Sequence, residues 1–216
     1  MATVLPLQLD SSGRVFEEAA RVLRRSRVIA VPTETFYALG APVQDEVAIR
    51  RVCAIKGRPQ GKPILVLIAD QAQLTALVDE ITSAATTLME RFWPGPLTLI
   101  FQASPLLPEV LTAGTRSVGV RQTAHSGLAR LLRHVGPLTG TSANRSGELP
   151  ARTAEEVQTT LGSEVDLILD GGPATGELPS TIVDTVGPIR LLREGPISRQ
   201  QIEATLSMVG MALGSS

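Results

Sequence analysis

The stretch "DEVAIRRVCAIKGRPQGKPILVLI", residues 45–68, joins a helical pattern to an apolar strand through a cationic loop. Aliphatic residues recur at helical spacing over 45–55, and Gly57 is typical of a helix end. The run "PILVLI" at 63–68 is apolar and bounded by proline and aspartate, which predicts a buried strand. A helix that leads directly into a buried strand favours an α/β fold.

The same alternation continues on both sides of this stretch. The patterns predict further helices at 15–25, 70–79, 83–92, 126–134, 153–161 and 198–206, and further strands at 28–32, 97–101, 117–121, 137–141, 166–170, 181–185 and 189–193. Because the last three strands crowd together, we expect a mixed parallel and antiparallel sheet. Without a repeat or a linker, the chain is predicted to form a single domain over 10–205, with tails at 1–9 and 206–216.

Composition excludes several classes of function. The formal net charge of −1 removes the general attraction to nucleic acids, and four Phe, one Trp and one Tyr are too few to stack successive bases. The lone Cys53 is interpreted as a buried small hydrophobe, and with only two histidines no zinc spacing occurs, so no metal ligands are predicted. No leader pattern or apolar run of about 18–20 residues is present, which predicts a cytoplasmic protein without membrane contact.

The cationic loop carries Lys56, Arg58 and Lys62 between glycines and prolines. Such a loop could hold a triphosphate, because it supplies two point charges and one bidentate guanidinium. Alternatively, these cations complement the dipole at the helix C-terminus and stay solvated. The loop alone favours the second interpretation.

Small polar residues follow a predicted strand in "GTSANRSG" at 140–147. Thr141, Ser142 and Asn144 could donate to phosphate or sugar at the strand end, where open α/β sheets bind ligands. An ordinary polar turn explains the same residues equally well.

Three other segments place polar groups beside strands. Alternation puts Ser117, Gly119 and Arg121 on one face of a strand, where Arg121 could clamp a carboxylate or form a surface ion pair. Ser180 begins a strand and Arg193 ends one. In "VPTETFYALG" (31–40), a polar cluster follows a buried strand and could bind a small polar metabolite; its members are Thr33, Glu34, Thr35 and Tyr37. A Thr/Glu capping pattern for the following turn is the alternative.

No familiar nucleotide-binding or hydrolytic motif is present: G-x-x-x-x-G-K-[ST], G-x-G-x-x-G, H-E-x-x-H and G-x-S-x-G are all missing. Catalysis would therefore depend on positioning and charge stabilisation.

Six ordered segments over about residues 15–200 resemble the YrdC-like family of threonylcarbamoyl-AMP synthases: "PTETFYALG", "AIKGRPQGKPI", "FWPGPLTLIF", "SVGVRQTAH", "GTSANRSGELPART" and "STIVDT" with "RLLREG". The resemblance implies a twisted open mixed sheet flanked by helices, with a positively charged cavity. It also implies a nucleotidyltransferase that condenses L-threonine, bicarbonate or CO2 and ATP, with Mg²⁺, into threonylcarbamoyl-AMP and pyrophosphate. The product serves N6-threonylcarbamoyladenosine modification of ANN-decoding tRNAs.

By the same resemblance, Lys56 and Arg58 are catalytic. The implied ATP-binding residues are Lys56, Arg58, Lys62, Ser117, Thr141, Ser142, Asn144 and Arg193, and the implied threonine-binding residues are Thr33, Arg121 and Ser180. Two positions depart from the family pattern: Ala38 replaces a usual glycine, and Leu67 stands where some members have a histidine.

The chain resembles the short form of the family, which implies separate proteins for the transfer to tRNA. Three alternatives stay open. They are a domain that makes a carbamoyl-adenylate from carbamoyl phosphate, a non-catalytic module with weak RNA binding, and an inactive paralogue of the same fold.

Overall fold

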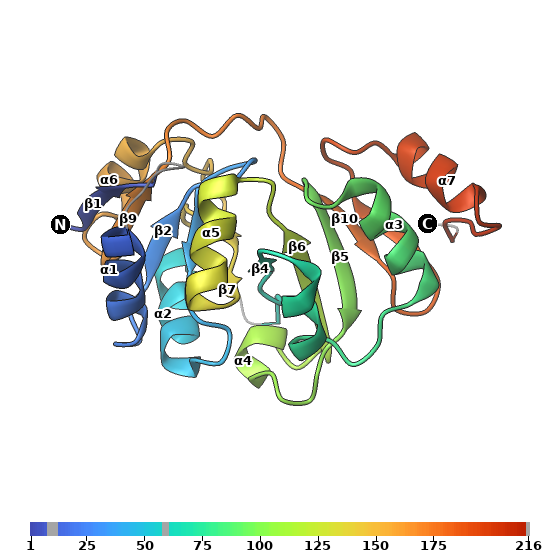
Figure 1. Cartoon of the computed structure of the whole chain (residues 1–216), viewed down its shortest axis with the longest axis horizontal. Coiled ribbons are helices and arrows are strands. Elements are labelled where there is room, and N and C mark those ends of the chain that lie inside the picture. Colours follow the sequence, from blue (N-terminus) through green and yellow to red (C-terminus); the bar gives the residue numbers. More distant parts are fainter. Residues whose placement is uncertain (8–12, 58–60, 215–216) are drawn as a thin grey trace.

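The computed structural model describes residues 1–7, 13–57 and 61–214 (Figure 1). The strands are β1 (Thr3–Pro6), β2 (Ile29–Val31), β3 (Ala38–Gly40), β4 (Val66–Ile68), β5 (Leu97–Gln102), β6 (Ser117–Gln122), β7 (Leu138–Thr139), β8 (Thr141–Ser142), β9 (Leu167–Asp170), β10 (Thr181–Asp184) and β11 (Arg190–Arg193). The helices are α1 (Gly13–Leu23), α2 (Glu46–Lys56), the 3-10 helix η1 (Gln71–Ala76), α3 (Ser83–Phe92), α4 (Glu109–Thr112), α5 (Ser126–Val135), α6 (Ala154–Leu161) and α7 (Arg199–Ser207).

Hydrogen bonding divides the described strands between two mixed sheets. The first sheet has the order β1-β9-β2-β3-β8, and the second has the order β11-β10-β5-β6-β4-β7. Each combines parallel and antiparallel pairs; β2, for example, pairs in parallel with β9 and antiparallel with β3. The α/β class with mixed strands is confirmed, and its strands form two sheets instead of one.

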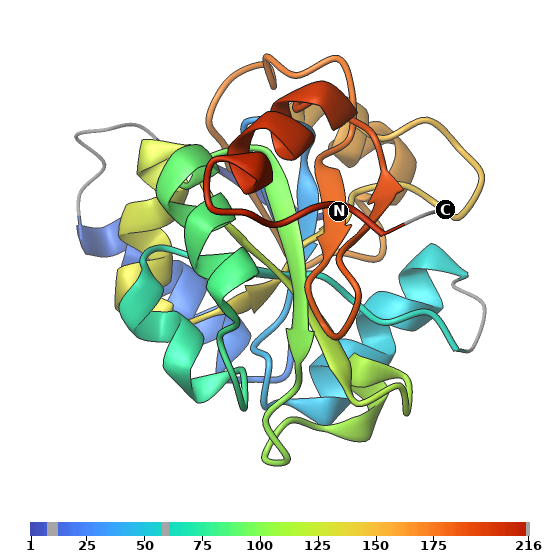
Figure 2. The same ribbon diagram turned by 90° about the vertical axis from the view of Figure 1, so that its right-hand side faces the viewer.

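Helices cover both faces of the first sheet but only one face of the second sheet over its strands β5, β6 and β10. Alternate residues of β2 point to opposite cores: Ile29 and Val31 pack with α1 and α5, whereas Ala30 packs with α2 and α6. Behind the second sheet, α3 and α7 lie together in the core that contains Leu99 and Val120 (Figure 2). The opposite face of these strands of the second sheet therefore has no helix of the described chain packed against it.

The chain crosses between the sheets at Gly140, where β7 of the second sheet leads into β8 of the first. A Cβ atom at this position would lie 2.4 Å from Leu67 Cγ and 2.6 Å from Leu65 Cδ2, so glycine is required by the close approach of β4. The predicted strand 137–141 is thus two short strands with a junction at Gly140.

Most predicted elements are present with shifts of one or two residues at their ends, but three predictions are wrong. The residues predicted as a tail at 1–9 include β1, which pairs in parallel with β9 from Thr3 to Pro6. In the predicted tail 206–216, Leu206 is fully buried and the Gly214 N–H bonds to the Ile189 carbonyl. The region 70–79 contains the 3-10 helix η1 and no α-helix. In each case a distant partner or core, which local patterns do not encode, decides the outcome.

Candidate functional site

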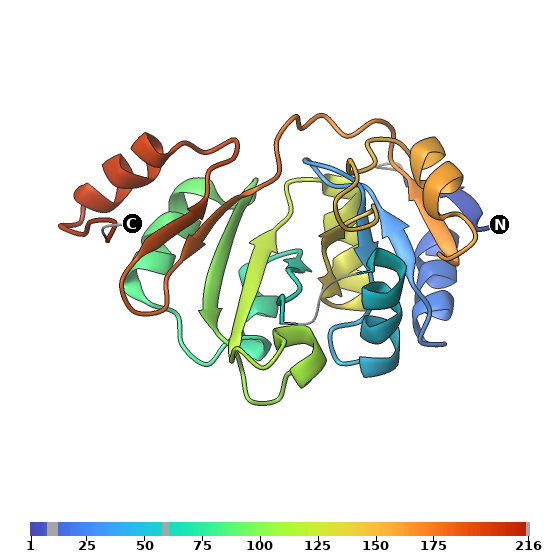
Figure 3. The same cartoon turned by 180° about the vertical axis from the view of Figure 1, so that it is seen from behind.

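A cavity of about 470 Å³ lies where the two sheets meet. Its lining comes from the β2–β3 loop, the end of α2, the segment before β4, and strands β5, β6, β8, β10 and β11. Figure 3 shows the two sheets from behind, with the segment that joins β9 to β10 running across the top from one to the other. The site therefore combines segments that are far apart in the sequence.

The uncovered face of the second sheet forms one wall. Alternate residues of its three neighbouring strands line the cavity: Thr98 and Ile100 from β5, Gly119 and Arg121 from β6, and Ser180, just before β10, with Ile182. The intervening residues Val118 and Val120 are buried in the core, as alternation predicts. Polar groups therefore lie beside Ile100 and Ile182 on this face of the sheet.

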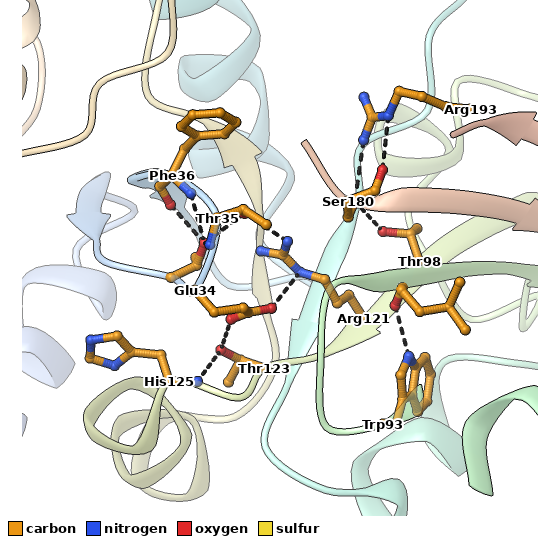
Figure 4. A network of polar contacts seen from close by, with 12 residues as sticks. Glu34, Thr35, Phe36, Trp93, Thr98, Arg121, Thr123, His125, Ser180 and Arg193 are labelled. Atoms are coloured by element: carbon orange, nitrogen blue, oxygen red, sulfur yellow. Dashed lines mark hydrogen bonds and ion pairs between the residues drawn. The ribbon is translucent and has the colours of Figure 1, made fainter. Parts of the chain in front are cut away.

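Arg121 is the most buried charge in this wall, with an exposure of 3%. Its Nη1 donates to Thr35 Oγ1 at 2.8 Å, and its Nε lies 3.5 Å from Glu34 Oε1 (Figure 4). Burial lowers the pKa of the Arg121 guanidinium, while the charge of Glu34 opposes that shift. Since an arginine guanidinium is not deprotonated in proteins, Arg121 supplies a positive charge to this wall.

Ser180 connects Arg121's wall to Arg193 at the end of β11. The Ser180 and Thr98 hydroxyl oxygens lie 2.8 Å apart, and Arg193 donates from Nε to the Ser180 carbonyl at 2.9 Å and from Nη2 to the Ser180 hydroxyl at 3.2 Å. Desolvation lowers the pKa of Arg193, and the nearby Arg121 adds to this effect. Two guanidinium groups and two hydroxyl groups therefore converge on one side of the cavity (Figure 4).

Lys56 lies on the opposite side, at the C-terminal end of α2. Its Nζ donates to the Asn144 carbonyl at 2.9 Å, to Asn144 Oδ1 at 2.8 Å and to the Ser142 carbonyl. The Ser142 hydroxyl also donates to Asn144 Oδ1 at 2.7 Å. With an exposure of 4%, Lys56 both adds positive charge to this wall and fixes the shape of the segment 142–144.

The structure brings together most of the residues predicted for the site. The cavity is lined by Lys56, Lys62, Arg121, Thr141, Ser142, Asn144, Ser180 and Arg193. Arg58 lies outside the described residues. Two predicted residues are elsewhere: Ser117 is at the far end of β6 and bonds to Thr115, and Thr33 is behind the cavity wall.

Thr33 organises the β2–β3 loop. Its Oγ1 donates to the Phe36 carbonyl at 2.7 Å and accepts from the N–H groups of Thr35 and Phe36. Because the Thr33 proton is used on Phe36, the Thr35 hydroxyl donates to Thr33 and accepts from Arg121. These bonds agree with the alternative of a cap for the following turn, because Thr33 Oγ1 accepts from the N–H groups two and three residues further on. The element that follows this turn is strand β3.

The sequence analysis missed Thr98 as a lining residue and named Thr35 only as one member of a polar cluster. Thr35 belongs to the polar cluster "PTET", but its choice over Thr33 depends on the loop conformation. Thr98 could have been found by alternation within the predicted strand 97–101.

The lining defines the class of protein that this fold can support. Four cationic side chains and several hydroxyl and amide groups surround a cavity of small-molecule size, and no Asp or Glu lines it among the described residues. This arrangement is typical of an α/β protein that binds anionic ligands such as nucleotides or carboxylates.

Metal and membrane features were also sought in the described part of the chain. It contains no group of three His, Cys, Asp or Glu side chains that could hold a metal ion. None of its helices has the length and apolar character needed to cross a membrane.

Comparison with known proteins assigns the family. The family model Sua5_yciO_yrdC, described as "Telomere recombination", matches residues 21–195. The chain therefore belongs to this family, as its motifs predicted.

Two relatives and one solved structure show the extent of the similarity. A threonylcarbamoyl-AMP synthase of Bacillus subtilis is 39% identical over 97% of this chain and 61% of its own length. One of Chromobacterium violaceum is 39% identical over 83% of this chain and 93% of its own length. The crystal structure of Pyrococcus abyssi Sua5 complexed with L-threonine has a TM-score of 0.89 at 34% identity and covers 99% of this chain and 62% of that one. The chain thus spans about three fifths of the Bacillus relative.

Proposed function

We propose that the protein is a threonylcarbamoyl-AMP synthase, a nucleotidyltransferase that condenses L-threonine, bicarbonate or CO2 and ATP. The observation that carries the proposal is the pairing of two donor groups across one cavity. Arg121 and Ser180 lie on the second sheet, and Lys56, Ser142 and Asn144 lie on the first-sheet side. The names of the relatives and the threonine complex of the Pyrococcus structure support this assignment.

Each donor group suits a different substrate. The buried guanidinium of Arg121 can bind the carboxylate of an amino acid bidentately, and the hydroxyl oxygens of Thr35, Thr98 and Ser180 can accept from its amine. Lys56, with Lys62 at the rim, Arg193 and Arg58, would face the nucleotide, with Thr141, Ser142 and Asn144 along its phosphates or sugar. In this proposal Ser117 and Thr33 support the walls and do not contact ligands.

The proposed chemistry needs no protein nucleophile. The threonine amine attacks CO2, forms an N–C bond and releases one proton, which gives a carbamate. A carbamate oxygen then attacks the α-phosphorus of ATP, and the bond from this phosphorus to the bridging oxygen breaks, so that pyrophosphate leaves. Mg²⁺ enters as the counter-ion of the ATP phosphates, and the Lys56 and Arg58 charges stabilise the leaving group.

The cavity contributes by holding the reactants in line. Well-oriented intramolecular reactions gain several kcal/mol, roughly 7–11 in the best cases, from positioning alone. In this proposal the protein releases threonylcarbamoyl-AMP to separate proteins that transfer the threonylcarbamoyl group to tRNA.

The test is pyrophosphate release from ATP, Mg²⁺ and bicarbonate, measured with and without L-threonine. We expect threonine-dependent release that falls by about 100-fold or more in the Lys56→Ala/Arg58→Ala variant, because charge stabilisation of the leaving group is lost.

Arg193→Ala and Arg190→Ala make a matched pair on β11. Arg193 lines the cavity, whereas Arg190 pairs with Asp184 outside it. We expect Arg193→Ala to reduce release and Arg190→Ala to leave it unchanged. No release by the unmodified protein under any of these conditions would overturn the proposed function.

A further inference from the structure

Glu34 places a part-buried carboxylate directly behind Arg121. Its Oε2 accepts from the Thr123 hydroxyl at 2.8 Å, and the Thr123 oxygen in turn accepts from the His125 N–H at 3.1 Å (Figure 4). Its other oxygen, Oε1, lies 3.5 Å from Arg121 Nε. The carboxylate is therefore held by Thr123 on one side and faces the guanidinium on the other.

Two consecutive residues of the β2–β3 loop lie next to two different nitrogen atoms of the Arg121 guanidinium. Thr35 accepts from Nη1, and Glu34 faces Nε. Neither Glu34 Oε1, an acceptor, nor Arg121 Nε, a donor, has a hydrogen-bond partner among the described residues. At 3.5 Å, the two atoms are placed to pair with each other. A small movement would complete a hydrogen bond between them.

The segment between β9 and β10 packs closely against the β2–β3 loop on the side of Glu34 and Thr35. A Cβ atom at Gly176, in the segment between β9 and β10, would lie 2.7 Å from Thr35 Cα and 2.8 Å from the Glu34 carbonyl oxygen. Thr33 closes the loop on the inside by its bond to the Phe36 carbonyl. Glu34 therefore sits on a loop that is closely packed and internally hydrogen-bonded, which suits a positioning residue.

We propose that Glu34 is a positioning residue for Arg121, which turns the Nη1/Nη2 end of the guanidinium toward the carboxylate of the amino-acid substrate. This inference rests on the proposed function. An arginine side chain has many rotamers. With Nε facing Glu34 and one Nη1 hydrogen donated to Thr35, the second Nη1 hydrogen and Nη2 remain for the carboxylate of the substrate. Glu34 also supplies the counter-charge that a buried guanidinium needs before a ligand arrives.

The first experiment compares Glu34→Gln with the unmodified protein. A glutamine has one acceptor oxygen, so it cannot accept from Thr123 and from Arg121 with separate oxygens. We expect the Kd and KM for L-threonine to rise about tenfold, in line with the loss of one bond to a charged group. The kcat at saturating threonine and the Kd for ATP should change less than about twofold, because the change affects binding alone.

Glu177→Gln is the matched control. Glu177 is an exposed carboxylate in the same β9–β10 segment, so the same substitution should leave the threonine Kd unchanged. An unchanged threonine Kd in Glu34→Gln, in a protein that binds threonine, would overturn the positioning role.

A second experiment is independent of any ligand. Urea unfolding is measured for Glu34→Gln in the unmodified protein and in an Arg121→Met background. We expect Glu34→Gln to lower the unfolding midpoint in the former and to raise it in the latter, because Glu34 without Arg121 is an unpaired part-buried charge.

This reversal separates the two proposals. If the unmodified protein binds no threonine but the reversal occurs, the proposed function fails while the pairing of Glu34 with Arg121 stands. Equal effects of Glu34→Gln in both backgrounds would overturn the pairing itself.

Discussion

His125 begins helix α5 with an imidazole that accepts the Leu128 N–H through Nδ1 at 3.1 Å. A protonated imidazole has no acceptor nitrogen, so this N-cap requires the neutral ring. Desolvation lowers the pKa of His125, and the nearby Glu34 charge opposes the shift. Protonation of this one residue should therefore oppose folding.

The sign of the pH effect follows from linkage. The folded pKa lies below the unfolded value of about 6.5, so the unfolded state binds the proton first as the pH falls. The stability is fully present above pH ~6.5 and is lost as the pH falls toward the folded pKa. His125→Asn keeps a capping oxygen but cannot titrate. We expect urea unfolding to show a smaller loss of stability between pH 7.5 and 5.5 in this variant than in the unmodified protein. Equal losses would show that His125 does not contribute.

Residue-level prediction from sequence succeeded where a regular element set the geometry. Alternation along a strand placed Arg121 on the polar face, and the structure puts it in the cavity. It could not choose between Thr33 and Thr35, because the loop after β2 follows no period. Alternation also could not show that Ser117 lies outside the cavity lining, since the extent of the cavity depends on the neighbouring strands.

At the scale of elements, the junction between β7 and β8 decides how the two sheets meet. The pattern at 137–141 predicts one strand, because nothing local indicates that Gly140 separates two pairing partners. The reason lies across the sheet, where Leu65 and Leu67 of the β4 segment leave no room for a side chain. The same kind of long-range cause explains why β1 and its parallel pairing with β9 were predicted as a tail.

Gly140→Ala tests this junction. The added Cβ would overlap Leu67 Cγ, so we expect a loss of about 1–3 kcal/mol in the free energy of unfolding by urea. Gly13→Ala is the control, because a Cβ there meets nothing within 4 Å. In a Leu67→Ala background the cost of Gly140→Ala should shrink, since one overlapping side chain is gone. An undiminished cost would contradict the role of Leu67 and would leave the contact with Leu65 or the backbone as the reason for glycine.

At the scale of the whole molecule, the cavity lies where the two sheets meet, and one core cluster joins them, since Leu67 and Leu138 of the second sheet pack with Ile29 of the first. The proposed nucleotide side is built on α2 and β8, and the proposed carboxylate side on β5, β6 and β10. The hydrogen bond from Arg121 on β6 to Thr35 in the β2–β3 loop connects the two sides of the cavity. If ATP or L-threonine contacts both sides of the cavity, its binding orders the interface between them. The other ligand needs the same interface, so the two substrates should raise each other's affinity.

The coupling can be measured by titrating L-threonine calorimetrically with and without a saturating ATP analogue that cannot be cleaved at the α-phosphorus. With a coupling free energy of about 1 kcal/mol, the Kd for threonine should fall about fivefold in the presence of the analogue. Reciprocity requires threonine to lower the Kd of the analogue by the same factor.

The Thr35→Val variant removes the acceptor of the hydrogen bond that connects the two sides of the cavity. In this variant the analogue should therefore change the threonine Kd by a factor close to one. An equal threonine Kd with and without the analogue in the unmodified protein would instead mean that each half of the cavity binds its ligand independently. The bond between Arg121 and Thr35 would then serve the geometry of one site only.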